Sequence, residues 1–91
     1  MAGRLTLYGR AYCHLCEEMA QALRALEPLL AGRPFALERK DVDADPALAG
    51  RYGAHVPVLL VDGAVLCAHR LDARRVAAAL AGEPWEPLEL R

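Results

Sequence analysis

Hydrophobic residues in the first third of the chain change from a strand-like run to a helical stripe. Residues 4–8 form the run, which ends at Gly9 and predicts a strand. Beyond the cysteines Cys13 and Cys16, apolar side chains recur every three or four residues, at Leu15, Met19, Leu23, Leu26 and Leu30. This spacing predicts a helix that begins at the cysteines and turns one face toward the core. The helix ends near Glu27 or kinks there, because Pro28 cannot donate a backbone hydrogen bond and clashes with the preceding turn.

The middle of the chain has a less regular pattern. Residues 35–42 place charged and apolar side chains on both faces, which is typical of an edge strand whose charges discourage further pairing. Asp45 followed by Pro46 is a helix-start signal, an N-cap and then the first helical position. A short helix is therefore expected over residues 46–52, ending at Gly53.

The last third begins with a continuous apolar run. Residues 56–61 have the composition of a strand buried on both faces, and Asp62-Gly63 predicts a hairpin turn into a second strand over residues 64–69. Asp72 is then the expected cap of a helix that ends at Gly82. Its inward-facing residues are expected to be Leu71, Val76, Ala79 and Leu80.

These elements follow the order β-α-β-α-β-β-α. A right-handed crossover makes the first two strands parallel neighbours, and the hairpin adds two antiparallel strands. The predicted fold is an α/β domain over residues 1–82, a four-stranded mixed sheet flanked by helices, with a tail over residues 83–91. The two cysteines begin a helix where a central strand ends.

Composition narrows the possible functions. The 91 residues are 55% hydrophobic but only 5% aromatic, and the net charge is −1. The chain lacks a basic stripe of the kind that binds nucleic acid, and it has no apolar run long enough to cross a membrane. No leader pattern is evident, so a cytoplasmic location is expected. Three cysteines in such a chain indicate a redox or metal role rather than a set of structural disulfides.

The C-x-x-C pair at a helix N-terminus favours thiolate chemistry. The first helical N–H groups lack intrahelical partners, and the helix dipole places partial positive charge behind them. This lowers the pKa of a cysteine from about 8.5 by about one, which raises its thiolate fraction at neutral pH. Cys13 is the expected nucleophile because it lies nearer the cap, and Cys16 is the expected resolving thiol one turn inside. Arg10 and His14 are the nearby candidates for further stabilisation of the thiolate.

Other interpretations of the same residues remain open. Cys13 and Cys16 could be inert, or could form half of a zinc site completed by Cys67 and His69. We expect Cys67 to be a buried strand residue rather than a third redox thiol. A haem attachment motif is excluded, because Glu17 and not histidine directly follows the second cysteine.

The remaining polar and aromatic candidates have ordinary explanations. The aspartates at positions 41, 43 and 45 are explained by a turn and an N-cap rather than a metal site. His14 is expected to face solvent, and His55 and His69 are expected at the surface or an edge. Tyr8 and Tyr12 are expected to pack around the cysteines, with Tyr12 as a candidate border of a substrate groove.

Several motifs together resemble the thioredoxin fold in its short, glutaredoxin-like form. They are Thr6-Leu7-Tyr8 leading to Tyr12-Cys13-His14-Leu15-Cys16, then Val56-Pro57, then Val61-Asp62-Gly63. The runs at residues 41–46 and 52–59 resemble small bacterial glutaredoxin-like proteins of unassigned role. The resemblance covers roughly residues 5–80, most of the chain.

The resemblance implies roles for particular residues. It implies a cis peptide bond between Val56 and Pro57 beside the active-site sulfurs, with the Val56 backbone available to a bound peptide or glutathione. It places Arg10 where many glutaredoxins have a lysine near the glutathione carboxylate. The chain differs at residues 67–68 and 70–71, where glutaredoxins have a Gly-Gly pair and polar residues that contact glutathione.

The expected function is thiol–disulfide exchange with protein or small-molecule disulfides. No tightly bound cofactor or metal is expected. Glutathione is a candidate reductant, and a thioredoxin-reductase-type donor is the other candidate. The alternative from a different class is a non-catalytic binding or assembly module that holds zinc or an iron–sulfur cluster.

Overall fold

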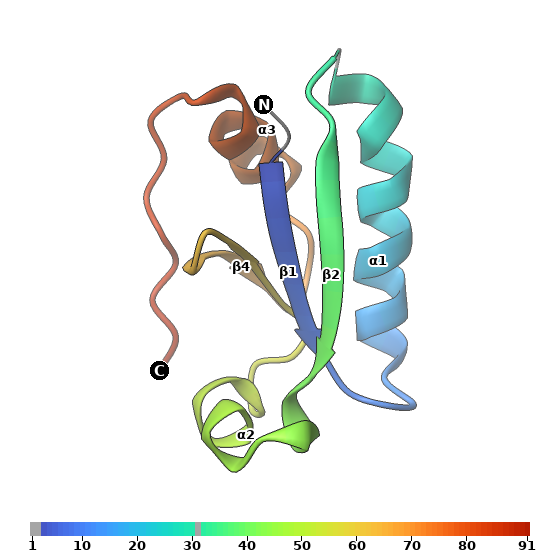
Figure 1. The fold of residues 1–91 in the computed structure, drawn as a ribbon, viewed down its shortest axis with the longest axis vertical. Coiled ribbons are helices and arrows are strands. Elements are labelled where there is room, and N and C mark those ends of the chain that lie inside the picture. The colour runs from blue at the N-terminus through green and yellow to red at the C-terminus, as the bar shows by residue number, and fades with distance from the viewer. Residues whose placement is uncertain (1–2, 31) are drawn as a thin grey trace.

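A four-stranded sheet organises the chain in the computed structural model, which describes residues 3–30 and 32–91 (Figure 1). Its strands are β1 (Gly3–Gly9), β2 (Phe35–Asp41), β3 (Val58–Val61) and β4 (Ala64–Ala68), in the order β2-β1-β3-β4. β1 pairs parallel with β2 and antiparallel with β3, and β3 pairs antiparallel with β4. The predicted mixed sheet is confirmed, with β2 at an edge and the carboxyl end of β1 in the interior. Residues 1–2, which the predicted domain includes, lie outside the described part.

The helices cover both faces of this sheet. They are α1 (His14–Leu26), α2 (Pro46–Tyr52) and α3 (Ala73–Ala81), with short 3₁₀ segments η1 (Glu27–Leu30) and η2 (Val42–Ala44). The larger core cluster joins α1 and α3 to one face through Leu23 and Val76, both fully buried. The smaller cluster joins η2 and α2 to the other face through Val42 and Tyr52.

Residues of β3 alternate between these two clusters. Leu59 and Val61 belong to the larger cluster, whereas Val58 and Leu60 belong to the smaller one. Because successive side chains of a strand point to opposite faces, a strand covered on both sides must be apolar throughout. This explains the continuous hydrophobic run in the sequence.

The local signals in the sequence act as predicted at most element ends. The Asp45 side chain accepts the Ala47 N–H at 2.9 Å and caps α2, and Asp72 accepts the Arg75 N–H at 3.1 Å and caps α3. Asp62 and Gly63 both have positive φ, as the tight hairpin turn requires. The two strands of this hairpin are shorter than predicted: they span residues 58–61 instead of 56–61, and 64–68 instead of 64–69.

Leu15 is the exception on the predicted inner stripe of α1. Its exposed fraction is 43%, whereas Cys16 is buried at 1%, so the expectation that Leu15 faces the core is wrong. The inner stripe consists of Cys16, Met19, Ala20 and Leu23. The spacing of apolar residues alone fits either Leu15 or Cys16 as the inward-facing residue. The packing of the helix start against the end of β1 buries Cys16.

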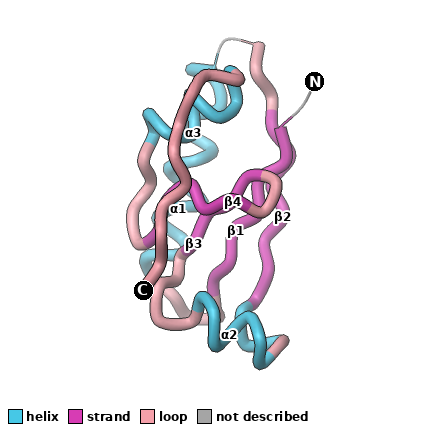
Figure 2. The backbone as a smooth tube through the Cα atoms, turned by 90° about the vertical axis from the view of Figure 1, so that its left-hand side faces the viewer, coloured by secondary structure: helices cyan, strands magenta, loops and turns pink. Residues whose placement is uncertain are grey.

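The C-terminal residues lie along the molecule from the end of α3 toward α2 (Figure 2). Trp85 packs against the larger core cluster, and Leu90 packs against the smaller one. The Leu88 N–H donates to the Val65 carbonyl at 2.9 Å. The predicted tail therefore contacts both cores and the β4 edge.

Candidate active site

The two cysteines lie at the start of α1, as the sequence predicts, and are joined by a disulfide. Cys13 is the N-cap residue with extended backbone angles, and its Sγ accepts the backbone N–H of Cys16 at 3.1 Å. The Cys13 carbonyl accepts the Glu17 N–H at 3.2 Å, so helical hydrogen bonding begins there. The Cys13 sulfur thus occupies the position where an N-cap side chain normally carries partial negative charge.

The two sulfurs have different environments. Cys16 is 1% exposed and belongs to the inner face of α1, whereas Cys13 is half-buried. An incoming disulfide can therefore reach Cys13 directly but reaches Cys16 only through Cys13. This asymmetry is what a nucleophile and a resolving thiol require.

Gly9 provides the space that the buried sulfur occupies. A Cβ atom at position 9 would lie 3.0 Å from the Cys16 Sγ and 3.2 Å from its Cβ. The sequence analysis treated Gly9 only as a strand end. A glycine four residues before the first cysteine was the available signal, but only the approach of β1 to α1 shows its role.

The exposed rim of the site consists of residues 12, 14 and 15. Tyr12 is fully exposed with a φ of 57°, and it lines an open pocket of about 440 Å³ with Cys13, His14 and Glu17. The expectation that Tyr12 packs around the cysteines is wrong, because the turn directs its ring into solvent. Tyr8 instead stacks on Tyr52, with ring centroids 4.8 Å apart.

His14 faces solvent, as predicted. Its side chain is 91% exposed, and its Nε2 lies 3.6 Å from a Glu18 carboxylate oxygen. This exposed contact along one helix face contributes little to stability.

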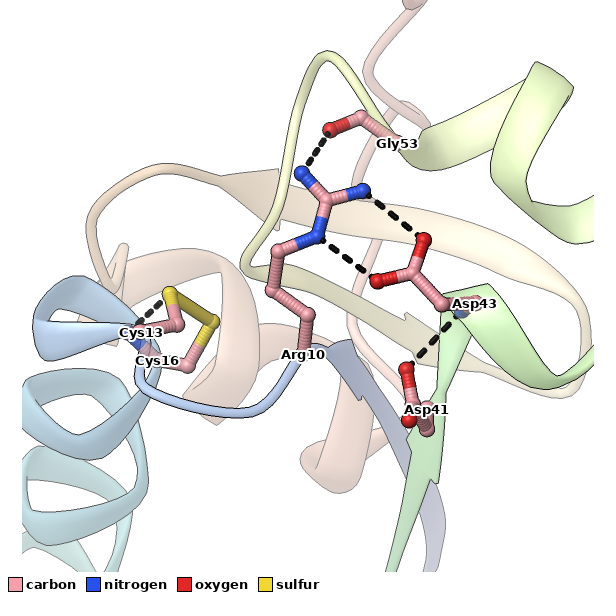
Figure 3. A network of polar contacts seen from close by, with 6 residues as sticks. All are labelled: Arg10, Cys13, Cys16, Asp41, Asp43 and Gly53. Atoms are coloured by element: carbon pink, nitrogen blue, oxygen red, sulfur yellow. Dashed lines mark hydrogen bonds and ion pairs between the residues drawn. A yellow bond between two sulfur atoms is a disulfide. The ribbon is translucent and has the colours of Figure 1, made fainter.

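Arg10 points away from the sulfurs (Figure 3). Its Nε and Nη2 donate to the two carboxylate oxygens of Asp43 at 3.2 and 3.3 Å, and Nη1 donates to the Gly53 carbonyl at 3.2 Å. Arg10, the candidate for stabilising the Cys13 thiolate, therefore has its guanidinium engaged by Asp43 and Gly53. The turn and N-cap expected for the three aspartates do not explain the contact of Asp43 with Arg10. Asp41 does serve the turn, because its side chain accepts the Asp43 N–H at 2.8 Å.

A second pocket of about 300 Å³ lies beside Cys16. Its lining comes from β1, the loop after it, α1 and the β2 edge: Leu7, Gly9, Arg10, Ala11, Cys16, Glu17, Arg39, Lys40 and Asp41. Arg39 donates to Glu17 at 2.7 Å, and this hydrogen bond holds the pKa of the Glu17 carboxyl below its ordinary value.

The Val56–Pro57 peptide bond is cis. Pro57 is buried, and its carbonyl accepts the His69 N–H at 2.8 Å, which joins the segment before β3 to the one after β4. The His55 and His69 rings lie edge to face with centroids 6.1 Å apart. His69 is exposed and His55 is half-buried, in agreement with their expected surface positions.

Cys67 is a buried residue of β4, where it is paired with Leu59 in the sheet register. Burial raises the pKa of its thiol above the ordinary value. Within residues 3–30 and 32–91, no group of three or more histidine, cysteine or acidic side chains is arranged to hold a metal ion. In this structure Cys67 and His69 are not grouped with Cys13 and Cys16 in an arrangement of that kind.

Comparison with known proteins identifies first the fold of the chain and then its family. The fold is thioredoxin-like, and the Drosophila melanogaster thioredoxin Deadhead shares it at 20% identity with a TM-score of 0.52, over 89% of this chain and 80% of its own. Residues 4–81 match the family model of the glutaredoxin-like domain (DUF836). The chain therefore belongs to this glutaredoxin-like family.

Solved structures of bacterial proteins agree with this assignment. A Nitrosomonas europaea protein is 36% identical with a TM-score of 0.77, over 87% of this chain and 92% of that one. An X. campestris protein is 40% identical with a TM-score of 0.60, over 88% of this chain and 99% of that one. No curated protein sequence matches the chain. No helix among the described residues is long and apolar enough to cross a membrane.

Proposed function

We propose that this protein is a thiol–disulfide oxidoreductase in which Cys13 is the nucleophile and Cys16 is the resolving thiol. One observation carries the proposal: the sulfur of the half-buried Cys13 accepts a hydrogen bond from the Cys16 N–H at the start of α1, while the Cys16 side chain is buried. A hydrogen bond to a charged sulfur is stronger than one to a neutral sulfur. The same N–H therefore favours the Cys13 thiolate over the thiol.

The exchange proceeds in two displacements. The Cys13 thiolate attacks one sulfur of a substrate disulfide, which forms a mixed disulfide and releases the first thiolate. Cys16 then loses its proton and attacks the Cys13 sulfur, and the second substrate thiolate leaves. The two released thiolates take up two protons, one lost by Cys16 and one from solvent, so the substrate gains two electrons and becomes two thiols while the protein ends with the Cys13–Cys16 disulfide.

The proposed substrates are protein or small-molecule disulfides, in a reducing, cytoplasmic setting. Glutathione or a thioredoxin-reductase-type protein is the proposed source of electrons for return to the dithiol. With glutathione, two molecules deliver two electrons and leave as glutathione disulfide, with no tightly bound cofactor.

The decisive experiment equilibrates the purified protein across graded glutathione redox buffers, followed by alkylation and intact-mass measurement. A Cys67→Ala background leaves only the two active-site thiols to count. A reversible two-electron transition is expected, and Cys16→Ser should accumulate a mixed disulfide that Cys13→Ser cannot form. A pair that never oxidises across the series would overturn the proposal.

The same protein, purified without oxygen, tests the metal-binding alternative. The proposal predicts no stoichiometric metal. Zinc or iron that is present stoichiometrically and is lost in Cys13→Ser would favour an assembly module instead.

A further inference from the structure

The basic side chains beside Cys16 are neutralised by neighbouring carboxylates. Three cations line the 300 Å³ pocket. Their partners are Asp43 for Arg10 at 3.2 Å, Glu17 for Arg39 at 2.7 Å and Glu38 for Lys40 at 3.0 Å. Glu17 and Asp41 also line the pocket, whereas Asp43 and Glu38 pair with Arg10 and Lys40 from outside its lining. With these partners counted, three cations lie among four carboxylates.

The Arg10–Asp43 pair has the most extensive hydrogen bonding of the three. Both Asp43 oxygens accept from the guanidinium, and the Gly53 carbonyl accepts a third hydrogen bond (Figure 3). The opposed planar groups form a bidentate arrangement, which fixes direction as well as distance. Arg10 thereby turns the donors with which it could bind a substrate carboxylate toward Asp43.

We propose that Asp43 is a specificity-determining residue that makes the site discriminate against net-anionic disulfides. Asp43 occupies the Arg10 donors, and each of the three lining cations is paired with a carboxylate, so an anionic substrate finds no free cation there, whereas a neutral disulfide needs none. The inference rests on the proposed exchange reaction, which supplies the chemistry, and adds the class of disulfide that the site accepts.

Asp43→Asn is a mild way to unmask Arg10. The Asp43 side chain is 56% exposed, and its carboxylate contacts only Arg10 among the hydrogen bonds of the described chain. The amide keeps one acceptor but loses the charge, so the guanidinium can turn toward a substrate carboxylate. Favourable local charge raises association rates by roughly tenfold or more. Half-exposed groups are partly screened, so we expect a gain of about threefold to tenfold.

The experiment compares the reduced protein with two disulfides in parallel. Glutathione disulfide is the net-anionic probe and hydroxyethyl disulfide is the neutral probe, and oxidation of the Cys13–Cys16 pair is followed by stopped-flow fluorescence or quenched alkylation. The readout is the ratio of the anionic to the neutral rate constant. Asp43→Asn should raise this ratio about threefold to tenfold, and the gain should shrink as salt is raised, because screening shortens the Debye length to about 3 Å at 1 M.

Two matched variants test whether the gain comes from freeing Arg10 or only from the change in the net charge of the protein. Asp62→Asn removes the same charge in the exposed β3–β4 turn, and the ratio should stay at the wild-type value. Arg10→Gln combined with Asp43→Asn removes the unmasked cation and should abolish the gain. Asp43→Ser provides a second unmasking variant, and thermal melts show that each variant is folded.

The outcomes also separate this inference from the proposed function. Exchange with both disulfides but an unchanged ratio in Asp43→Asn and Asp43→Ser overturns the role of Asp43 alone. A gain of equal size in the double variant overturns the masking of Arg10. Failure of the wild-type protein to react with either disulfide overturns the proposed oxidoreductase and this inference with it.

Discussion

Gly9→Ala should destabilise the oxidised protein more than the reduced protein. The added methyl group would lie 3.0 Å from the Cys16 Sγ and 3.2 Å from its Cβ, closer than ordinary van der Waals contact. In the disulfide the Cys16 sulfur is bonded to Cys13 and cannot move aside. In the dithiol the sulfur can rotate away while the contact with the Cys16 Cβ remains, so the clash is larger in the oxidised form.

The magnitude follows from two opposing effects. Overpacking of a buried site costs about 1–3 kcal/mol, whereas replacing glycine by alanine recovers about 0.4–1 kcal/mol by restricting the unfolded chain. The net loss in the oxidised form is therefore about 1 kcal/mol, with a smaller loss in the reduced form, where only the Cβ contact remains. Each 1 kcal/mol by which the loss in the oxidised form exceeds that in the reduced form makes the reduction potential more positive by about 20 mV.

Two independent assays measure this difference. Urea denaturation of the oxidised and reduced forms gives the two stability changes, and equilibration with glutathione redox buffers gives the potential. Gly50→Ala is the matched control, because Gly50 lies inside α2 with nothing within 4 Å of an added Cβ. It should stabilise both forms by about 0.5–1 kcal/mol, since alanine is the better helix former, and leave the potential unchanged. Equal stability changes in the two forms of Gly9→Ala, or an unchanged potential, would refute the steric argument.

Three further predictions concern the scaffold. Leu23→Ala should lower the free energy of unfolding by about 2–5 kcal/mol in urea denaturation, because the side chain is fully buried in the larger core and leaves a cavity; a loss below 1 kcal/mol would contradict this packing. Asp72→Ala should cost about 1 kcal/mol by removing the acceptor for the Arg75 N–H, whereas Asp72→Asn should retain most of that stability, and equal losses in both variants would argue against a cap. Burial raises the pKa of the Cys67 thiol, so the unfolded chain ionises first as pH rises; stability should fall above about pH 8.5 in the wild-type protein more steeply than in Cys67→Ala, and parallel pH profiles would count against the burial effect.

Signals that act within a few residues were sufficient to predict the elements. Asp45 with Pro46, Asp72, and Asp62-Gly63 each satisfy or direct the backbone next to them, so their effect does not depend on the rest of the fold. The continuous apolar run before the hairpin likewise predicted a strand buried on both faces, because such composition is stable only between two packed layers. The cysteine motif at the start of a helix followed from the same local reasoning.

Leu15 and Arg10 show where this reasoning stops. Adjacent positions at a helix start fit an apolar stripe equally well, and only the docking of α1 against β1 buries Cys16 instead of Leu15. The partner of Arg10 lies 33 residues away in the sequence, and local chemistry does not select one carboxylate among the three aspartates near residue 43.

The sequence by itself determined the order of the elements, the mixed sheet and the helix start that carries Cys13 and Cys16, because capping, turn formation and hydrophobic periodicity are local or repetitive. The tertiary structure alone decided that Gly9 accommodates the Cys16 sulfur and that Asp43 neutralises Arg10. Both depend on distances between segments that the chain brings together only on folding. Charge pairing and steric clearance are set by those distances, which no pattern along the chain records.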